Sequence, residues 1–244
     1  MVSTIILSFT ILHALTMAVA LVGNTLLIYI VWNKPATRSL TSFLFVNMAV
    51  ADLLTTCFLM PTTLAHFYSN NMTDSTCGFI FYAGLVSATA SIFCLTIMAF
   101  DRYFAVAHPF RQSLWFRKPK IIMPIVWISS MALMSMAPVV FKSKRGMCSY
   151  DMLPQPVIPL LVFWTYILVI TFILPLAIIT ILYSIVIGKL WLHRTPLEHE
   201  TSPEQDIPKI KIIRMLVIIV VVFTVCWLPM HVYQMEAAVY AYMV

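Results

Sequence analysis

The sequence predicts an all-α membrane protein, a bundle of transmembrane helices, on two observations. The first is composition: of 244 residues, 61% are hydrophobic and 10% are charged, whereas about 25% of the residues in soluble domains are charged. The second is patterning, since long uncharged apolar stretches recur six times between short polar connectors. So few charged side chains cannot cover a soluble domain of this size, which excludes a water-soluble enzyme.

Each apolar stretch is long enough to cross the ~30 Å hydrocarbon core of a bilayer as a helix, at about 1.5 Å per residue. The stretches are apolar on all sides and too long for barrel strands, which favours helices. We expect a single transmembrane domain over residues 1–244, with spans at about 5–32, 41–65, 77–106, 121–141, 157–188 and 208–236.

The first stretch resembles a signal peptide but predicts a true span. No basic residue precedes it, and it continues past Ala20 to Trp32, where basic residues follow. The second stretch contains Asp52, which is the only acid midway along one of the apolar stretches. The fifth and sixth stretches are separated by a polar, acidic connector at about 189–207, which we expect to be cytoplasmic.

Basic residues predict the orientation of the bundle. Twelve of the fifteen Lys and Arg residues lie in the connectors after spans one, three and five or at the span ends next to them, and the positive-inside rule places that side in the cytoplasm. Both termini are then expected outside the cell. The sequon Asn71-Met-Thr73 falls on the same outer side, which predicts glycosylation of Asn71. The net charge of +6 follows from topology and does not indicate nucleic-acid binding.

Asp52 is a candidate functional residue because an ionisable group midway along a span is costly to bury. Asn24 in span one and Ser91 in span three are expected to offer it polar partners. Two readings stay open, a sodium or proton site and a hydrogen-bonded packing network.

Motifs follow one another in order along the spans: Gly23-Asn24 with Leu27, Asn47 to Leu53, Cys77 with Asp101-Arg102-Tyr103, Trp127, Pro175 with Tyr183, and Phe223 to Pro229. In these residues the chain resembles the rhodopsin-like (class A) G-protein-coupled receptors, in their neuropeptide-receptor-like branch. The resemblance implies a rhodopsin-like transmembrane helix bundle. Six of the family's seven helices are found, and the chain is expected to be truncated before the seventh.

The resemblance also implies roles in activation. Arg102 is expected to hold the inactive state through Asp101 and to turn toward Tyr183 and a heterotrimeric G protein in the active state. Many family members pair this arginine with an acid at the position where this chain has Lys209. One ion pair that stabilises the inactive state is therefore expected to be missing. Outward movement of helix six transmits the signal. The residues implied in coupling and activation are Asp101, Arg102, Tyr103, Pro109, Phe110, Tyr183, Ile92, Pro175, Phe223 and Pro229.

Two of the five cysteines are expected to form a disulfide. Cys77 lies at the outer end of span three and Cys148 in the outer loop before span five, both on the oxidising side. Cys57, Cys94 and Cys226 lie within spans and are expected to be reduced packing residues.

The expected ligand is a neuropeptide. Gly84 stands where amine receptors of the family carry an aspartate, which disfavours an amine, and the lack of an acid near the outer end of span three disfavours an opsin. The outer loop from Lys142 to Cys148 is basic, and the acids Asp151 and Glu236 lie near it, so the surface suits a peptide. The expected ligand-binding residues are Thr63, Phe81, Gly84, Leu85, Ala88, Trp164, Thr171, Trp227, His231 and Gln234.

Other functions stay open at this point. These are a receptor for a non-peptide small molecule, a truncated receptor fragment without signalling activity and, remotely, a transporter or channel. A transporter would be expected to carry several intramembrane charges or broken-helix repeats. No enzyme is expected, because the spans contain no Ser-His pair, paired aspartates or His-Glu-x-x-His pattern.

The expected location is the plasma membrane, which the chain crosses several times. The expected partners are an extracellular peptide, a heterotrimeric G protein and membrane lipid, without nucleic acid. No cofactor and no metal are expected except an allosteric sodium ion at Asp52.

Overall fold

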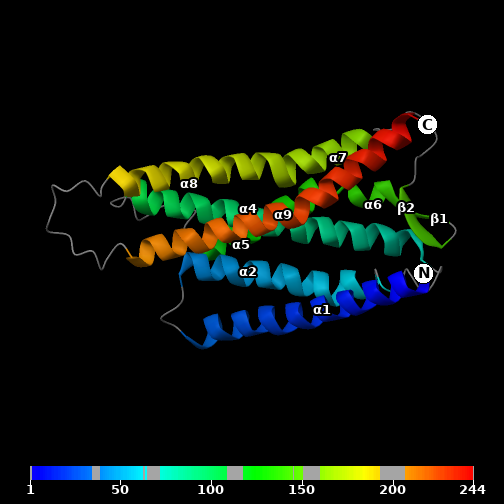
Figure 1. The fold of residues 1–244 in the computed structure, drawn as a ribbon, viewed down its shortest axis with the longest axis horizontal. Helices are drawn as coiled ribbons and strands as arrows, with labels where there is room; N and C mark the ends of the chain where they lie inside the picture. The colour runs from blue at the N-terminus through cyan, green and yellow to red at the C-terminus, as the bar shows by residue number, and fades with distance from the viewer. Residues whose placement is uncertain are drawn as a thin grey trace. The chain divides into compact units, whose positions relative to one another are not determined.

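The computed structural model of the chain describes residues 2–34, 39–62, 64, 72–108, 118–144, 146–150, 160–192 and 207–243. These residues are almost entirely helical, with one short hairpin (Figure 1). They form two compact units, Met1–Cys94 with Trp115–Pro154 and Leu95–Leu114 with Gln155–Val244. The helix α4 (Asp74–Ala107) contributes its first part to one unit and its last part to the other.

The first unit contains most of the early helices. They are α1 (Val2–Asn33), α2 (Leu40–Leu54) with the π-helical turn η2 (Thr55–Leu59), α5 (Pro119–Leu133) and α6 (Ala137–Val140). Helix α2 packs against α1 and α5. Side chains that favour helix starts stand at the first residues: the Ser39 hydroxyl accepts the Ser42 N–H at the start of α2, and Pro119 opens α5.

The second unit contains α7 (Leu160–Leu168), the π-helical turn η4 (Val169–Ile173), α8 (Leu174–Leu192) and α9 (Ile207–Met243). Helix α7 packs against α9. The widened turn η4 ends two residues before Pro175, and η2 ends two residues before Pro61. A proline lacks the N–H of the helical ladder and its ring clashes with the carbonyl four residues earlier, so a widened turn before it relieves the clash.

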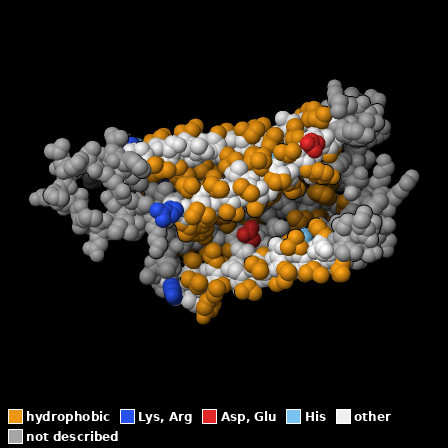
Figure 2. All heavy atoms as spheres, in the orientation of Figure 1, with side chains coloured by type: hydrophobic (Ala, Val, Ile, Leu, Met, Phe, Trp, Pro, Cys, Tyr) orange, Lys and Arg blue, Asp and Glu red, His pale blue; other side chains and the backbone are white. Residues whose placement is uncertain are grey.

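Large apolar side chains face outward along the helices. On α1, Leu12, Val19 and Val22 are each exposed by more than 60%, and Figure 2 shows hydrophobic side chains over the visible length of this helix. Such exposure is unfavourable in water but suits lipid tails. Among the described residues, six helices are long and apolar enough to cross a membrane. The predicted fold class, a rhodopsin-like helical bundle, is confirmed.

The fourth apolar stretch differs from the uninterrupted span expected at 121–141. Helix α5 ends at Leu133, a turn follows, and α6 begins at Ala137. Pro138 cannot donate a helical hydrogen bond and restricts the residue before it, while the Ala137 N–H bonds to the Met134 carbonyl at 3.0 Å and closes the turn. Phe141 therefore begins a strand instead of ending a helix.

An antiparallel hairpin follows this turn, which the sequence did not predict. Strands β1 (Phe141–Lys144) and β2 (Met147–Tyr150) pair so that Ser143 lies opposite Cys148. Gly146 in the connecting turn has a φ of 77°, a conformation that residues with a Cβ rarely adopt. The predicted disulfide between Cys77 and Cys148 is confirmed, with the two Cα atoms 5.4 Å apart.

We predict that replacing both disulfide cysteines by alanine lowers the thermal unfolding temperature of the protein in detergent. The bond spans a sequence separation of 71 residues, and in the chain-entropy account closing a loop of this length stabilises a fold by about 4 kcal/mol. The measurement is unfolding monitored by tryptophan fluorescence. The matched control is Cys57→Ser with Cys226→Ser, because both are free, exposed thiols. An unchanged unfolding temperature in the Cys77→Ala, Cys148→Ala variant would remove the structural role of the bond.

Candidate functional site

The acidic–basic pair near the end of α4 lies within the second unit. The Arg102 guanidinium donates a hydrogen bond to the Asp101 carboxylate, with 2.6 Å between nitrogen and oxygen. The Asp101 side chain is 1% exposed and that of Arg102 is 21% exposed. The ion pair offsets part of the desolvation cost of burying the charged Asp101 carboxylate. The guanidinium stays in partial contact with solvent and keeps further donors for other partners.

Tyr183 on α8 is buried and belongs to the same unit as Arg102. The structure thus brings together, within one unit, the arginine, its acid and the tyrosine predicted to receive it. Tyr103 lies beside them and makes edge contacts with the rings of Phe104 and His108. Two predicted coupling residues, Pro109 and Phe110, lie outside the described residues.

Aromatic side chains follow one face of α9 at a spacing of four residues. Ring centroids lie 5.7 Å apart between Phe223 and Trp227 and 5.9 Å apart between Trp227 and His231. Phe172 from η4 closes the cluster, 5.0 Å from the imidazole of His231. Pro229 lies within the same stretch and removes the helical bond to the Val225 carbonyl. The cluster therefore stands at a weakened part of the helix.

The predicted ligand-binding residues of the second unit include Trp227 and His231 of this cluster. Trp164, Thr171, His231 and Gln234 are all buried, and Trp227 is half-buried. The Nε2 atom of His231 is enclosed and has no hydrogen-bond partner among the described residues. An unsatisfied buried polar atom costs about 1–3 kcal/mol, so a bonding group brought by a ligand would be favoured here.

The predicted ligand-binding residues of the first unit lie on α4. Phe81 stacks on Phe141 of the hairpin, with centroids 3.8 Å apart, and a Cβ added at Gly84 would lie 2.9 Å from the Leu59 side chain. Leu85 is buried and Ala88 is half-buried. A larger residue at position 84 would require the Leu59 side chain to move. Thr63 lies outside the described residues, as does the predicted glycosylation site Asn71. Ligand binding by these residues stays a prediction.

The predicted polar network around Asp52 is not formed among the described residues. The Asp52 side chain is exposed, and its backbone carbonyl accepts a bond from Thr56. The Asn24 amide bonds instead to the Ala20 carbonyl of its own helix at 2.9 Å, an alternative open to short polar side chains in helices. Ser91 is half-buried on α4. The ion site therefore stays a prediction that rests on the acid alone.

The predicted connector residues are divided between the units. Ile92 is fully buried in the first unit. Pro175 is buried in the second, where the half-buried ring of Phe223 stacks with Trp227. Their joint role in activation stays a prediction.

A buried chain of hydrogen bonds joins three helices of the first unit, which sequence reasoning missed. The Trp127 indole N–H of α5 donates to the Asn47 carbonyl oxygen of α2 at 2.7 Å. The Asn47 amide in turn donates to the Cys94 sulfur of α4 at 3.1 Å. Asn47 is 5% exposed. The available signal was an asparagine within an apolar span, since buried amides need partners.

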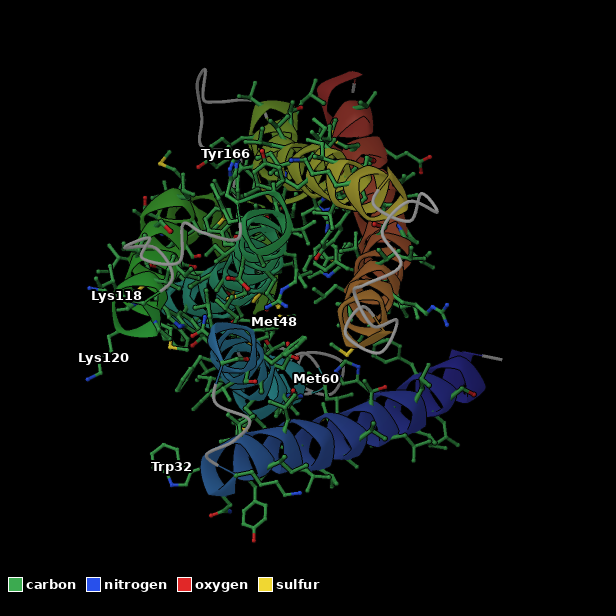
Figure 3. All side chains as sticks on the ribbon, turned by 90° about the vertical axis from the view of Figure 1, so that its left-hand side faces the viewer. Trp32, Met48, Met60, Lys118, Lys120 and Tyr166 are labelled. Atoms are coloured by element: carbon green, nitrogen blue, oxygen red, sulfur yellow. A yellow bond between two sulfur atoms is a disulfide. The ribbon has the colours of Figure 1, made fainter. Side chains whose placement is uncertain are left out.

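We predict that Asn47→Ala destabilises the helical domain by about 1–3 kcal/mol, because it leaves the Trp127 indole N–H buried without an acceptor. Trp127→Phe removes the donor, so the double variant should be less destabilised than the sum of the two single variants. The measurement is thermal unfolding in detergent. Trp32→Phe is the matched control, because Trp32 is 76% exposed and points away from its neighbours at the end of α1 (Figure 3). Fully additive effects would show that this bond does not join the helices.

The chain is similar to known receptors over nearly its whole length. The family described as 7 transmembrane receptor (rhodopsin family) matches residues 23–242. The chain is 30% identical to the Allatostatin-A receptor of Bombyx mori, over 92% of this chain and 64% of that protein. It is 28% identical to the RYamide receptor of Drosophila melanogaster, over 88% and 50%, and 33% identical to the Somatostatin receptor type 5 of Rattus norvegicus, over 90% and 61%.

The chain thus spans between half and two thirds of the length of these curated relatives. The relatives are receptors and not enzymes, in agreement with the sequence prediction. The family match covers all six apolar helices apart from the first part of α1, and it includes the Asp101–Arg102 pair and the aromatic cluster of α9. The chain belongs to the rhodopsin family of G-protein-coupled, seven-transmembrane receptors.

Proposed function

We propose that this receptor binds a neuropeptide at the cell surface and activates a heterotrimeric G protein through outward movement of the cytoplasmic part of α9. The observation that carries the proposal is the Asp101–Arg102 pair near the end of α4, in the same unit as Tyr183. Such a pair allows the guanidinium to bond either to Asp101 or to another partner such as Tyr183. A guanidinium has five donors and can exchange partners at a partly solvated helix end.

The link between ligand and G protein is the aromatic cluster of α9. His231 and Trp227 lie next to Pro229, where the helix lacks one backbone bond. A ligand that binds one position of these side chains more tightly shifts the population of helix positions by that difference in affinity. Phe223, one turn further along and in contact with Trp227, carries the shift toward the basic end of the helix.

A peptide is the proposed ligand because the relatives are named for peptides. They include receptors for allatostatin-A, RYamide and somatostatin. Charges at the ends of the elements agree with this class. Glu236 on α9 is exposed, and Lys142 lies on the hairpin. Each unit thus carries a charged side chain that a peptide could pair with.

The proposed topology places the chain in the plasma membrane with both termini outside. Support comes from the distribution of Lys and Arg, twelve of which lie in the connectors assigned to the cytoplasm or at the span ends next to them. Lys118 and Lys120 illustrate it at the start of α5, where their side chains project from the helix end (Figure 3). The hairpin with its disulfide then lies on the oxidising side.

We predict that Arg102→Ala abolishes G-protein activation while leaving peptide affinity within about threefold of the wild-type value, a difference of less than 1 kcal/mol. The receptor is expressed in cultured cells and challenged with allatostatin-A, RYamide and somatostatin peptides. Activation is read as separation of labelled Gα and Gβγ subunits. Lys120→Ala is the control, because it removes a basic side chain without touching the pair. A full response from Arg102→Ala would contradict the role of this residue. No response of the wild type to any peptide, with normal surface delivery, would count against a peptide ligand.

A sodium ion at Asp52 is also proposed, as a modulator of ligand affinity. Support comes from an exposed carboxylate on α2 that has no side-chain partner among the described residues. A carboxylate within a span needs a counter-charge or a proton.

We predict that Asp52→Asn makes peptide affinity insensitive to sodium, because the neutral amide no longer attracts the cation. The measurement compares peptide dissociation constants in sodium chloride and in N-methylglucamine chloride at equal ionic strength. Glu204→Gln is the control, since it removes an acid from the polar connector at about 189–207, outside the apolar runs. An equal sodium effect in Asp52→Asn and wild type would exclude this site.

A further inference from the structure

The hairpin is attached to the start of α4 on both of its strands. Cys148 of β2 is bound to Cys77 by the disulfide. Its cross-strand neighbour Ser143 of β1 donates its backbone N–H to the Asp74 carboxylate at 2.8 Å. Asp74 and Cys77 are three residues apart and therefore share one face of the first turn of the helix. Both residues of the cross-strand pair Ser143–Cys148 are therefore attached to the first turn of α4.

Met72, just before the helix, adds two further bonds. Its carbonyl accepts the Ser143 hydroxyl at 2.5 Å, and its N–H donates to the Gly146 carbonyl in the hairpin turn at 3.0 Å. The hairpin is therefore fixed at the disulfide, at β1 and at its turn. The disulfide alone would leave rotation about its single bonds, and the hydrogen bonds remove that freedom.

Asp74 is not needed to cap its own helix. The Thr73 hydroxyl accepts the Thr76 N–H at 3.2 Å and performs that role. The Asp74 carboxylate also favours the helix through its position at the positive end of the dipole, but this effect requires only a charge. The bond to Ser143 requires an acceptor at a particular place, so the two roles can be separated by substitution.

The orientation of the hairpin determines which of its two faces packs against α4. Phe141, on the same face of β1 as Ser143, is 1% exposed and stacks on Phe81 of α4. Side chains alternate along a strand, so Lys142 lies on the opposite face. A hairpin that swings would withdraw Phe141 from the helix and displace the positive charge of Lys142.

We propose that Asp74 is a positioning residue, which fixes the orientation of the hairpin so that its Lys142 face meets the peptide ligand. The part that concerns the ligand rests on the proposed function. The attachment of the hairpin does not, and it can be measured without any ligand.

The test is hydrogen exchange at the Ser143 amide of the full chain in lipid nanodiscs, resolved by fragmentation mass spectrometry. Asp74→Ala should speed this exchange about tenfold, as expected for loss of a bond to a charged acceptor. Exchange within α5 and the disulfide, seen on a non-reducing gel, should not change. Asp74→Asn keeps an acceptor oxygen and should retain most of the protection. Cleavage by trypsin after Lys142 should follow the same order.

The dissociation constant of the peptide that best activates the wild type should rise about tenfold in Asp74→Ala, at an unchanged maximal response. In Asp74→Asn it should stay near the wild-type value. Unchanged Ser143 exchange in Asp74→Ala, or equal effects of alanine and asparagine, would overturn the positioning role. Faster exchange with unchanged peptide affinity would overturn the link to the ligand. If no peptide activates the wild type, the proposed ligand class fails, and the exchange result still decides whether Asp74 holds the hairpin.

Discussion

The structure depends on one constraint, which is that polar groups within the hydrocarbon core must find partners inside the protein. Hydroxyl side chains meet it in the same way on successive helices: each donates to the carbonyl four residues earlier, as Thr16, Thr56, Thr89, Ser130, Thr171, Ser184 and Thr224 do. Asn47 meets it by bonding across helices, to Trp127 and Cys94. Among the described residues, the Asp52 carboxylate does not meet it, which is why a sodium ion is proposed there.

The same constraint explains where the helices weaken. Pro61 and Pro175 remove backbone donors, and the widened turns before them absorb the clash. Pro229 has an ordinary helical assignment around it and leaves one carbonyl of α9 without its bond. Pro124 does the same within α5, but only Pro229 lies beside the aromatic cluster, on the helix proposed to move. The buried Asp101 carboxylate instead has the partly exposed Arg102 guanidinium as its partner.

Much of the fold followed from the sequence, because a lipid environment requires long apolar runs and composition alone reveals them. The sequence motifs identified Arg102, Tyr183 and the two cysteines of the disulfide. The distribution of basic residues indicated which side of the membrane each of them faces. The hairpin was not predicted, because Phe141 is apolar and continues the apolar run of the fourth span. Its strand depends on Pro138, on the turn at Gly146 and on hydrogen bonds to the start of α4, none of which the apolar pattern reveals. The partners expected for Asp52 stay a prediction, because the Asn24 amide bonds to the Ala20 carbonyl in this structure. Whether Asn24 bonds across helices or to its own backbone depends on packing that a sequence does not show.

The central claim is that peptide binding moves the cytoplasmic end of α9 away from the end of α4, both of which belong to the second unit. The most direct measurement is electron–electron double resonance between spin labels at His108→Cys and Arg214→Cys, in a chain with Cys57→Ser and Cys226→Ser. The account predicts a longer distance when the activating peptide is bound and no lengthening when Trp227 is replaced by alanine. An unchanged distance in a receptor that still activates its G protein would contradict the account.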